Sequence, residues 1–316
     1  MRTRIPGRKR TASRHDQGYK RLFSHPSAVE HLLRGFLRED WADRLDFSSL
    51  ERVGNSFVSD DLRERHSDVI WRLRFQGKGQ WLYLLLELQS TSHHFMAVRL
   101  QSYAALLQEE VIRREKLRTR DPLPLVLPVV FYNGERPWRA PREMRSLYRE
   151  VQPGLRHWLP DLRYLVLDVR RLDLNRPELA GNWVAALLRI EACPNPDDLH
   201  GLAEELASML PPEDSELRRT ITIWLNSIFH RALPGAIIPL TKDTEGDMLE
   251  QTVRKWGELM MARGMRKLVL QLLTQRFGRL SAPVRRQVEA ISTPRELSSL
   301  HRKIVTARTL QETGLG

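Results

Sequence analysis

The clearest pattern along the chain is a pair of apolar runs on either side of a short polar segment. Residues 67–75 and 81–90 are dominated by Leu, Ile, Val, Trp and Phe, and Gln-Gly-Lys-Gly-Gln at 76–80 separates them. Gly and polar residues between two apolar runs are typical of a turn, so the pattern predicts a β-hairpin. The second run is apolar at consecutive positions, which predicts a central strand covered on both faces of its sheet.

Helices and further strands surround this hairpin. Apolar residues at helical spacing predict a helix after Phe23, which Ser24 or Ser27 could cap, and a long helix from His93 to Lys116. The remaining apolar runs predict strands at 50–58, 123–132 and 163–169, and a helix at 178–189. The order of a helix, three strands, a helix and a strand predicts an α/β domain.

The C-terminal third is predicted to be helical and separate. Pro211 and Pro212 interrupt the periodicity, a helix follows at 216–230, and residues 234–247 have the Gly and Pro content of a loop. Two apolar stripes then mark further helices: Leu268, Leu272, Leu273 and Phe277, and Leu297, Leu300, Ile304 and Val305. The sequence therefore predicts a flexible basic arm at 1–14, an α/β domain at 15–211, a linker region with a helix at 212–247 and a helical module at 248–316.

Charge and cysteine content narrow the function classes. The 316 residues include 51 Lys and Arg against 39 Asp and Glu, a net charge of +12, which favours a polyanionic partner such as DNA. The single cysteine, Cys193, excludes an intramolecular disulfide and a cysteine-cluster zinc site. The apolar run from Trp81 to Leu86 is far too short to cross a membrane, and no signal peptide is visible, so we expect a cytoplasmic protein.

Two carboxylates mark one edge of the predicted sheet. Asp68 opens the first hairpin strand and Glu87 closes the second, and antiparallel pairing brings these two ends together. Carboxylates held close together repel each other unless a cation lies between them, and Mg²⁺ takes such oxygen ligands. The carbonyl group of Leu88 could be a third ligand. Gln89 shares a face with Glu87, where it could orient an attacking water.

The ordered motifs along the chain resemble a known nuclease group. Glu87-Leu88-Gln89 resembles the Glu-x-Lys element of the PD-(D/E)xK nucleases, with Gln in the Lys position. Further motifs follow in order: His15-Asp16-Gln17-Gly18-Tyr19-Lys20, His66-Ser67-Asp68, Met96-Ala97-Val98-Arg99-Leu100 with Tyr103, and Pro128 to Gly134 with Trp138. Over about residues 13 to 210 the series resembles the Rpn family of recombination-promoting nucleases, also called YhgA-like transposases.

This resemblance implies a PD-(D/E)xK restriction-endonuclease-like core (αβββαβ) and a Mg²⁺-dependent DNA endonuclease, with Mn²⁺ as a substitute. It implies metal binding by Asp68, Glu87 and the Leu88 carbonyl, and catalysis by Asp68, Glu87 and Gln89. It also implies DNA contacts from His15, Asp16, Lys20, Arg99 and Tyr103. For the first three residues a structural cap on the site is an alternative. For the last two the alternative is a surface arginine over a core tyrosine, four residues apart on one helical face.

Residues 264–312 resemble a small helical module of unassigned role (DUF4351). Its Leu and Val stripes favour homo-oligomerisation, and a DNA-contacting helix pair is the alternative.

Two functions remain open for the whole chain. One is a metal-dependent endonuclease that promotes recombination or transposition. The other is a catalytically weak or inactive DNA-binding or assembly protein, because a Gln at 89 cannot supply the positive charge of a Lys.

Overall fold

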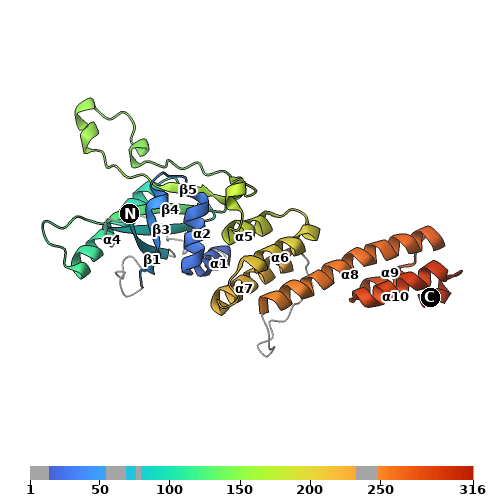
Figure 1. Ribbon diagram of the computed structural model, residues 1–316. Coiled ribbons are helices and arrows are strands. Elements are labelled where there is room, and N and C mark those ends of the chain that lie inside the picture. The colour runs from blue at the N-terminus through green and yellow to red at the C-terminus, as the bar shows by residue number, and fades with distance from the viewer. Residues whose placement is uncertain (1–13, 55–68, 76–79, 233–247, 316) are drawn as a thin grey trace, which may run out of the picture. The chain divides into compact units, whose positions relative to one another are not determined.

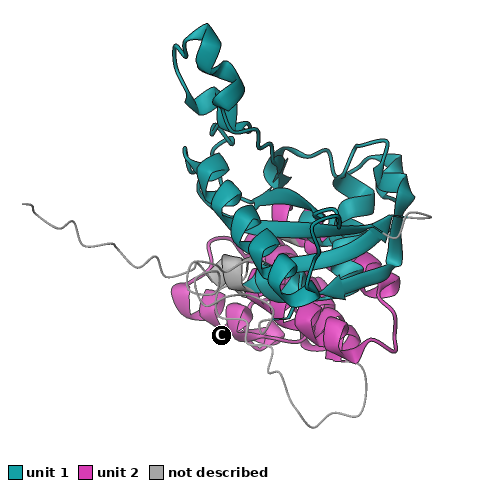
Figure 2. Cartoon of the chain, turned by 90° about the vertical axis from the view of Figure 1, so that its left-hand side faces the viewer, with its two compact units in different colours: residues 1–188 teal, residues 189–316 magenta. Residues whose placement is uncertain are grey.

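The computed structural model describes residues 14–54, 69–75, 80–232 and 248–315 (Figure 1). Its contacts divide the chain into two compact units, Met1–Leu188 and Arg189–Gly316 (Figure 2). The first unit is mixed α/β and the second is helical. A mixed α/β region followed by a helical C-terminal region, as the sequence predicts, is therefore confirmed.

A five-stranded sheet forms the centre of the first unit, in the order β1-β2-β3-β4-β5. Its strands are β1 (Leu45–Arg52), β2 (Val69–Phe75), β3 (Trp81–Gln89), β4 (Leu125–Tyr132) and β5 (Leu165–Asp168). β1, β2 and β3 pair antiparallel, whereas β4 and β5 continue the sheet parallel to β3. The predicted hairpin is the β2–β3 pair, and β3 is buried along nearly its whole length. The prediction of a central, doubly covered strand is confirmed.

Helices cover both faces of this sheet. On one face α4 (Met96–Glu115) packs Leu100, Leu107 and Val111 against Tyr83 and Leu85 of β3, together with residues of β4. On the other face lie α1 (Arg14–Leu22) and α2 (Pro26–Phe36), which are joined by a turn. The rings of Tyr19 and Phe23 there lie 4.6 and 4.9 Å from that of Phe131, whose side chain alternates to this face of β4.

α5 (Trp183–Ala192) is tied to α2 by polar contacts. Asn182 Nδ2 donates to the His31 carbonyl at 2.7 Å, and Trp183 Nε1 donates to Ser27 Oγ at 3.0 Å. The first unit also contains short 3₁₀ turns: η1 (Ala42–Arg44), η3 (Met144–Leu147), η4 (Pro153–Trp158), η5 (Val169–Arg171) and η6 (Pro177–Leu179). Two of them, η3 and η4, lie in a long excursion between β4 and β5 that stands out from the sheet in both views (Figures 1 and 2).

Five helices build most of the second unit: α6 (Leu199–Met209), α7 (Ser215–Ala232), α8 (Met248–Phe277), α9 (Ala282–Ala290) and α10 (Pro294–Thr306). The 3₁₀ turns η7 (Pro196–Asp198) and η8 (Gln311–Thr313) complete it. Val269 and Leu273 of α8 share a core with Val284, Val288 and residues of α10. Gly278, at φ +81°, ends α8 in a left-handed conformation that favours glycine. Among the described residues, no helix combines the length and apolar character that a bilayer crossing needs.

Several element boundaries differ from those predicted. The first strand is at 45–52 rather than 50–58, because it pairs Leu45 with Phe75 and so follows the register of β2. The helix expected from residue 178 begins at Trp183. Gly181, at φ +74°, has a left-handed conformation that interrupts helical geometry, and Asn182 Oδ1 accepts a hydrogen bond from the amide of Ala185 and so caps the helix. α6 has no counterpart among the predicted helices.

Three predictions about individual side chains were wrong. Neither Ser24 nor Ser27 caps α2, which begins at Pro26 after His25, and Ser24 Oγ instead donates to the Lys20 carbonyl. Val305 is 53% exposed and lies off the buried stripe of α10 that Leu297, Leu300 and Ile304 form. Leu268 is 62% exposed, because Val269 rather than Leu268 joins Leu273 in the core beside α8. The expected loop at 234–247 lies outside the described residues, and so does the expected basic arm apart from the first residue of α1.

Candidate active site

The end of β3 places a carboxylate inside the protein. Alternation along the strand turns Tyr83, Leu85, Glu87 and Gln89 toward α4, so the two polar groups continue an otherwise apolar row. Glu87 has no exposed surface and Gln89 is 6% exposed. Glu87 pairs with Val130 of β4, and both Val130 and Leu85 belong to the apolar core on this face of the sheet. Burying a charged group in this way costs free energy unless a partner neutralises it.

α4 supplies that partner. Arg99 Nη2 lies 2.6 Å from Glu87 Oε1, and Gln89 Nε2 donates to the same oxygen at 2.5 Å. Arg99 Nε also donates to the hydroxyl of Tyr103, one turn further along the helix, and its guanidinium carbon lies 5.4 Å from the centre of that ring. Buried Met96 and Leu100 fix the first turn of α4, and this packing directs Arg99 toward the end of β3.

The donor set fits a hard divalent cation. Gln89 Oε1 is buried and accepts no hydrogen bond from the described residues, so an amide oxygen stands beside the carboxylate with its lone pairs available. Carboxylate and amide oxygens are the ligands that Mg²⁺ prefers. Within the described ranges, no three His, Cys, Asp or Glu side chains come together in a way that could hold a metal ion.

The structure brings together four of the residues that the sequence analysis selected: Glu87, Gln89, Arg99 and Tyr103. Leu88 pairs with Phe131, and its side chain is buried on the opposite face of the sheet. Asp68 lies outside the described residues, which resume at Val69, and the side chains of His15 and Asp16 also lie outside them. Lys20 is half-buried on α1, the helix on the face away from α4.

Residues at the end of β4 close the site on one side and were not selected from the sequence as site residues. Tyr132 pairs with Gln89, and the amide of Asn133 donates to the Gln89 carbonyl at 3.1 Å. A Cβ at Gly134 would lie 2.2 Å from the Tyr132 hydroxyl oxygen, so only glycine allows this close return of the chain. Burial raises the pKa of Tyr132, and its protonated hydroxyl donates to the Arg136 carbonyl at 2.7 Å. An Asn-Gly pair directly after a buried strand was the available sequence signal.

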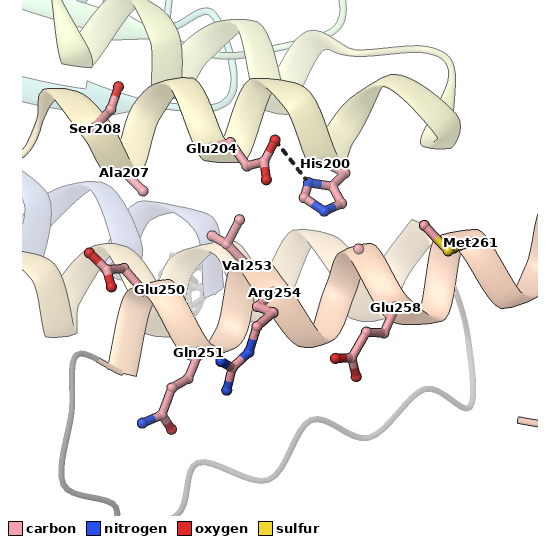
Figure 3. Close-up of a pocket in the computed structure, with 11 residues that line it drawn as sticks. His200, Glu204, Ala207, Ser208, Glu250, Gln251, Val253, Arg254, Glu258 and Met261 are labelled. Atoms are coloured by element: carbon pink, nitrogen blue, oxygen red, sulfur yellow. Dashed lines mark ion pairs between the residues drawn. The ribbon is translucent and has the colours of Figure 1, made fainter. Parts of the chain in front are cut away.

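A separate groove of about 900 Å³ lies within the second unit, between α6 and α8 (Figure 3). Its polar side chains include Glu204, Glu250, Arg254 and Glu258, and His200 Nδ1 lies 3.6 Å from Glu204 Oε2. Glu204, Glu250 and Glu258 are exposed carboxylates on the helix surfaces, and the one buried polar atom of the lining without a hydrogen bond from the described residues is His200 Nδ1, with no buried carboxylate of the groove beside it. The chemistry of the chain is therefore better placed at the end of β3.

Comparison with known proteins gives a consistent group of relatives. The family model described as "Putative transposase, YhgA-like" matches residues 13–219. Recombination-promoting nuclease RpnD of Escherichia coli O157:H7 is 31% identical over 232 residues, which cover 69% of this chain and 82% of RpnD. Recombination-promoting nuclease RpnA of Escherichia coli K12 is 30% identical over 275 residues, covering 84% of this chain and 91% of RpnA.

A further relative differs in its described activity. The inactive recombination-promoting nuclease-like protein RpnE of Escherichia coli K12 is 25% identical over 283 residues, covering 85% of this chain and 92% of RpnE. No solved structure matches the chain significantly.

Proposed function

The chain belongs to the YhgA-like transposase family of recombination-promoting nucleases, and we propose that it is a metal-dependent DNA endonuclease that promotes recombination or transposition of DNA. The observation that carries this proposal is Glu87, a fully buried carboxylate at a strand end, with the unused amide oxygen of Gln89 beside it. A carboxylate that served only the fold would gain nothing from an unsatisfied buried acceptor at its side.

We assign Asp68 as the second carboxylate. It directly precedes Val69, and Val69 pairs with Leu86, the residue before Glu87. Continued antiparallel pairing would therefore bring Asp68 opposite Glu87. The order of a helix, three strands, a helix and a strand from α2 to β4 supports a PD-(D/E)xK core. We further propose a nuclease domain at 15–211, which continues past the end of the first compact unit at Leu188, and a helical module at 248–316.

The roles of the residues follow from their chemistry. A bound Mg²⁺ or Mn²⁺ would supply Lewis-acid stabilisation of the phosphate charge and a hydroxide at neutral pH. Asp68, Glu87 and the Leu88 carbonyl would hold this ion. Gln89 Oε1 would accept a hydrogen bond from the attacking water and so orient it. Arg99, which is 26% exposed, would bind a phosphate oxygen through its planar guanidinium.

The test is plasmid nicking by the purified protein in Mg²⁺, Mn²⁺ or EDTA. Asp68→Ala and Glu87→Gln should each abolish metal-dependent cleavage, and DNA binding in EDTA should persist in both. Glu30→Gln is the matched control, because Glu30 is a surface acid on α2 that pairs with Arg34 at 2.8 Å. Cleavage that survives loss of either proposed ligand would overturn the assigned site.

A second function is favoured by one specific contact. Arg99 already neutralises Glu87, and a Gln stands where other PD-(D/E)xK nucleases carry a Lys. A catalytically weak protein that binds DNA and assembles through its C-terminal helices would have these features, and a relative named inactive supports keeping it. This second function predicts that the protein binds DNA but does not cleave it in the presence of either Mg²⁺ or Mn²⁺.

A further inference from the structure

The excursion between β4 and β5 has a tip without a core of its own. We call residues 136–163 the β4–β5 extension, which is the green segment at the upper left of Figure 1. Its turn η4 buries none of its residues. Trp158 is 75% exposed, Leu155 56% and Tyr148 45%. Single exposed apolar residues are common, but three on one short projecting segment favour a surface that contacts another molecule.

The base of the extension is firmly anchored, in contrast to its tip. Tyr164 Oη donates to the Pro141 carbonyl at 2.7 Å, and the Met144 amide donates to the Leu162 carbonyl at 2.9 Å. The ring of Trp138 lies 6.3 Å from that of Tyr164, and Glu143 and Arg163 form an antiparallel bridge. These contacts hold the tip in a defined position away from the sheet.

The anchor is also next to the candidate active site. The ring of Trp138 lies 5.0 Å from that of Tyr132, which is the residue of β4 that pairs with Gln89. The chain thus leaves the sheet beside the site, forms the extension and returns into β5. A molecule bound at the end of β3 would therefore lie beside the base of the extension.

The charge of the extension selects the class of partner. It contains seven arginines against three acidic residues, a net +4 in a chain whose total is +12. Arg145 and Arg163 pair with Asp161 and Glu143, whereas exposed Arg149 and Arg156 make no ion pair with any described residue. Arginine and aromatic residues are enriched in protein interfaces as well, so the excess of positive charge is what favours a polyanion. Surfaces that bind single-stranded nucleic acid combine such charge with exposed aromatic rings.

We propose that the β4–β5 extension is a DNA-binding element that contacts unpaired bases beside the cleavage site. Arg149 and Arg156 neutralise phosphates, and Trp158 stacks on a base. Within a duplex the faces of the bases are covered by their neighbours, so Trp158 can stack only where a base is unpaired. The inference takes the position of the DNA from the proposed function. The experiment that tests it measures DNA binding rather than cleavage.

The experiment measures affinity in EDTA for a single-stranded oligonucleotide and for its duplex, over a series of salt concentrations. Arg149→Ala with Arg156→Ala should weaken binding to both DNAs and reduce the salt slope by about 2, because each lost phosphate contact removes about one released counterion. Trp158→Ala should weaken binding to the single strand about tenfold and to the duplex much less, because it removes only stacking. Trp158→Phe should restore most of the loss.

Matched controls lie at the opposite end of β4. Arg118→Ala with Arg120→Ala removes two exposed arginines from the loop before β4, and Leu125→Ala removes a side chain that is 60% exposed. These variants should bind like the wild type. None of the substitutions removes a buried group, so unfolding temperatures should stay the same.

Each contrary result has a distinct meaning. Equal losses in the extension variants and the controls would mean that only net charge matters and would overturn the inference. Unchanged affinity with a smaller particle mass by light scattering would identify a second copy of the chain as the partner and would also overturn it. Failure of wild-type cleavage, with the binding losses as expected, would overturn the endonuclease proposal alone.

Discussion

Arg99 Nη2 lies 2.6 Å from Oε1 of Glu87, so the positive charge that a metal ion would supply at this carboxylate is already supplied by the protein. Glu87 has no exposed surface, and the side chain of Arg99 is 26% exposed. An arginine that is partly in solvent can move away from a fully buried acid, whereas the acid cannot move to water. The pair therefore stabilises the fold by itself, and under the proposed function a metal ion would compete with Arg99 for the same oxygen.

Replacing Arg99 by Gln should separate these two effects. Stability without metal should fall by about 2 kcal/mol, less than for a fully buried pair because Arg99 reaches solvent. Affinity for Mn²⁺ should rise, since a competing cation has been removed. Cleavage should fall because a phosphate ligand is lost. Thermal unfolding and calorimetric titration with Mn²⁺ measure the first two effects independently of activity.

The control for this variant is Arg113→Gln on the same helix. Arg113 is 68% exposed and lies about 21 Å from Arg99 along α4, at 1.5 Å per residue. Arg113→Gln should leave Mn²⁺ binding unchanged. An unchanged Mn²⁺ affinity in Arg99→Gln itself would contradict competition for Glu87.

Gln89 should prove more important for activity than for stability. Gln89→Met keeps the volume of the side chain, removes the donor to Glu87 Oε1 and also removes the unused acceptor Oε1. The lost hydrogen bond and the removed unsatisfied group act in opposite directions, so the free energy of unfolding should change by less than about 1 kcal/mol. Cleavage should fall at least about tenfold, since a positioning group is lost. A variant that cleaves at the wild-type rate would remove Gln89 from the mechanism.

The sequence predicted the part of this site that depends on one strand and one helix. Alternation along β3 places Glu87 and Gln89 on one face of the strand, and helical spacing places Arg99 and Tyr103 on one face of α4. The direct ion pair between the two elements was not predictable, because it depends on how α4 lies across the sheet. The parallel pairing of β3 with β4 could not be predicted from the sequence either, because a parallel crossover leaves no local signal comparable to a hairpin turn.

The extension was missed for a different reason. Hydrophobic periodicity detects elements that bury one face, and residues 145–161 bury almost nothing. Trp158 falls in a stretch without period, where an aromatic residue predicts no element. The density of arginines between Arg136 and Arg163 was the one local indication. The position of β1 was wrong because its pairing with β2, rather than local apolar content, decides where it begins.

Stability should depend on pH through Glu110, a buried acid on α4. Burial alone would raise the pKa of Glu110, but charged hydrogen bonds from Arg114 and Arg113 outweigh it and hold this pKa below its ordinary value. A carboxyl group with a lowered folded pKa contributes stability above its unfolded pKa of about 4.3 and loses this contribution as the pH falls through the folded value. Glu110→Gln should therefore cost about 1 kcal/mol at pH 7 and much less at pH 3.

Urea unfolding at both pH values measures the effect. Glu109→Gln, at the exposed neighbouring position, removes the same charge from α4 and should leave the pH dependence of the wild type intact. A cost of Glu110→Gln that is equal at the two pH values would show that the arginine contacts do not act through ionisation.

Two glycines of α8 should respond to the same substitution in opposite directions. A Cβ at Gly264 meets nothing within 4 Å, so Gly264→Ala should stabilise the protein by about 0.5 to 1 kcal/mol through helix propensity. A Cβ at Gly257 would lie 1.8 Å from Nε2 of His200 on α6, and the imidazole would have to leave its place beside Glu204 in the groove of Figure 3. Gly257→Ala should therefore destabilise the protein by about 1 kcal/mol, since the clash outweighs the propensity gain.

In a His200→Ala background the clash is gone, and Gly257→Ala should become stabilising like Gly264→Ala. Urea unfolding of the four variants measures this cycle, and a destabilisation that persists without His200 would mean that the helix backbone itself, not the imidazole, requires glycine there.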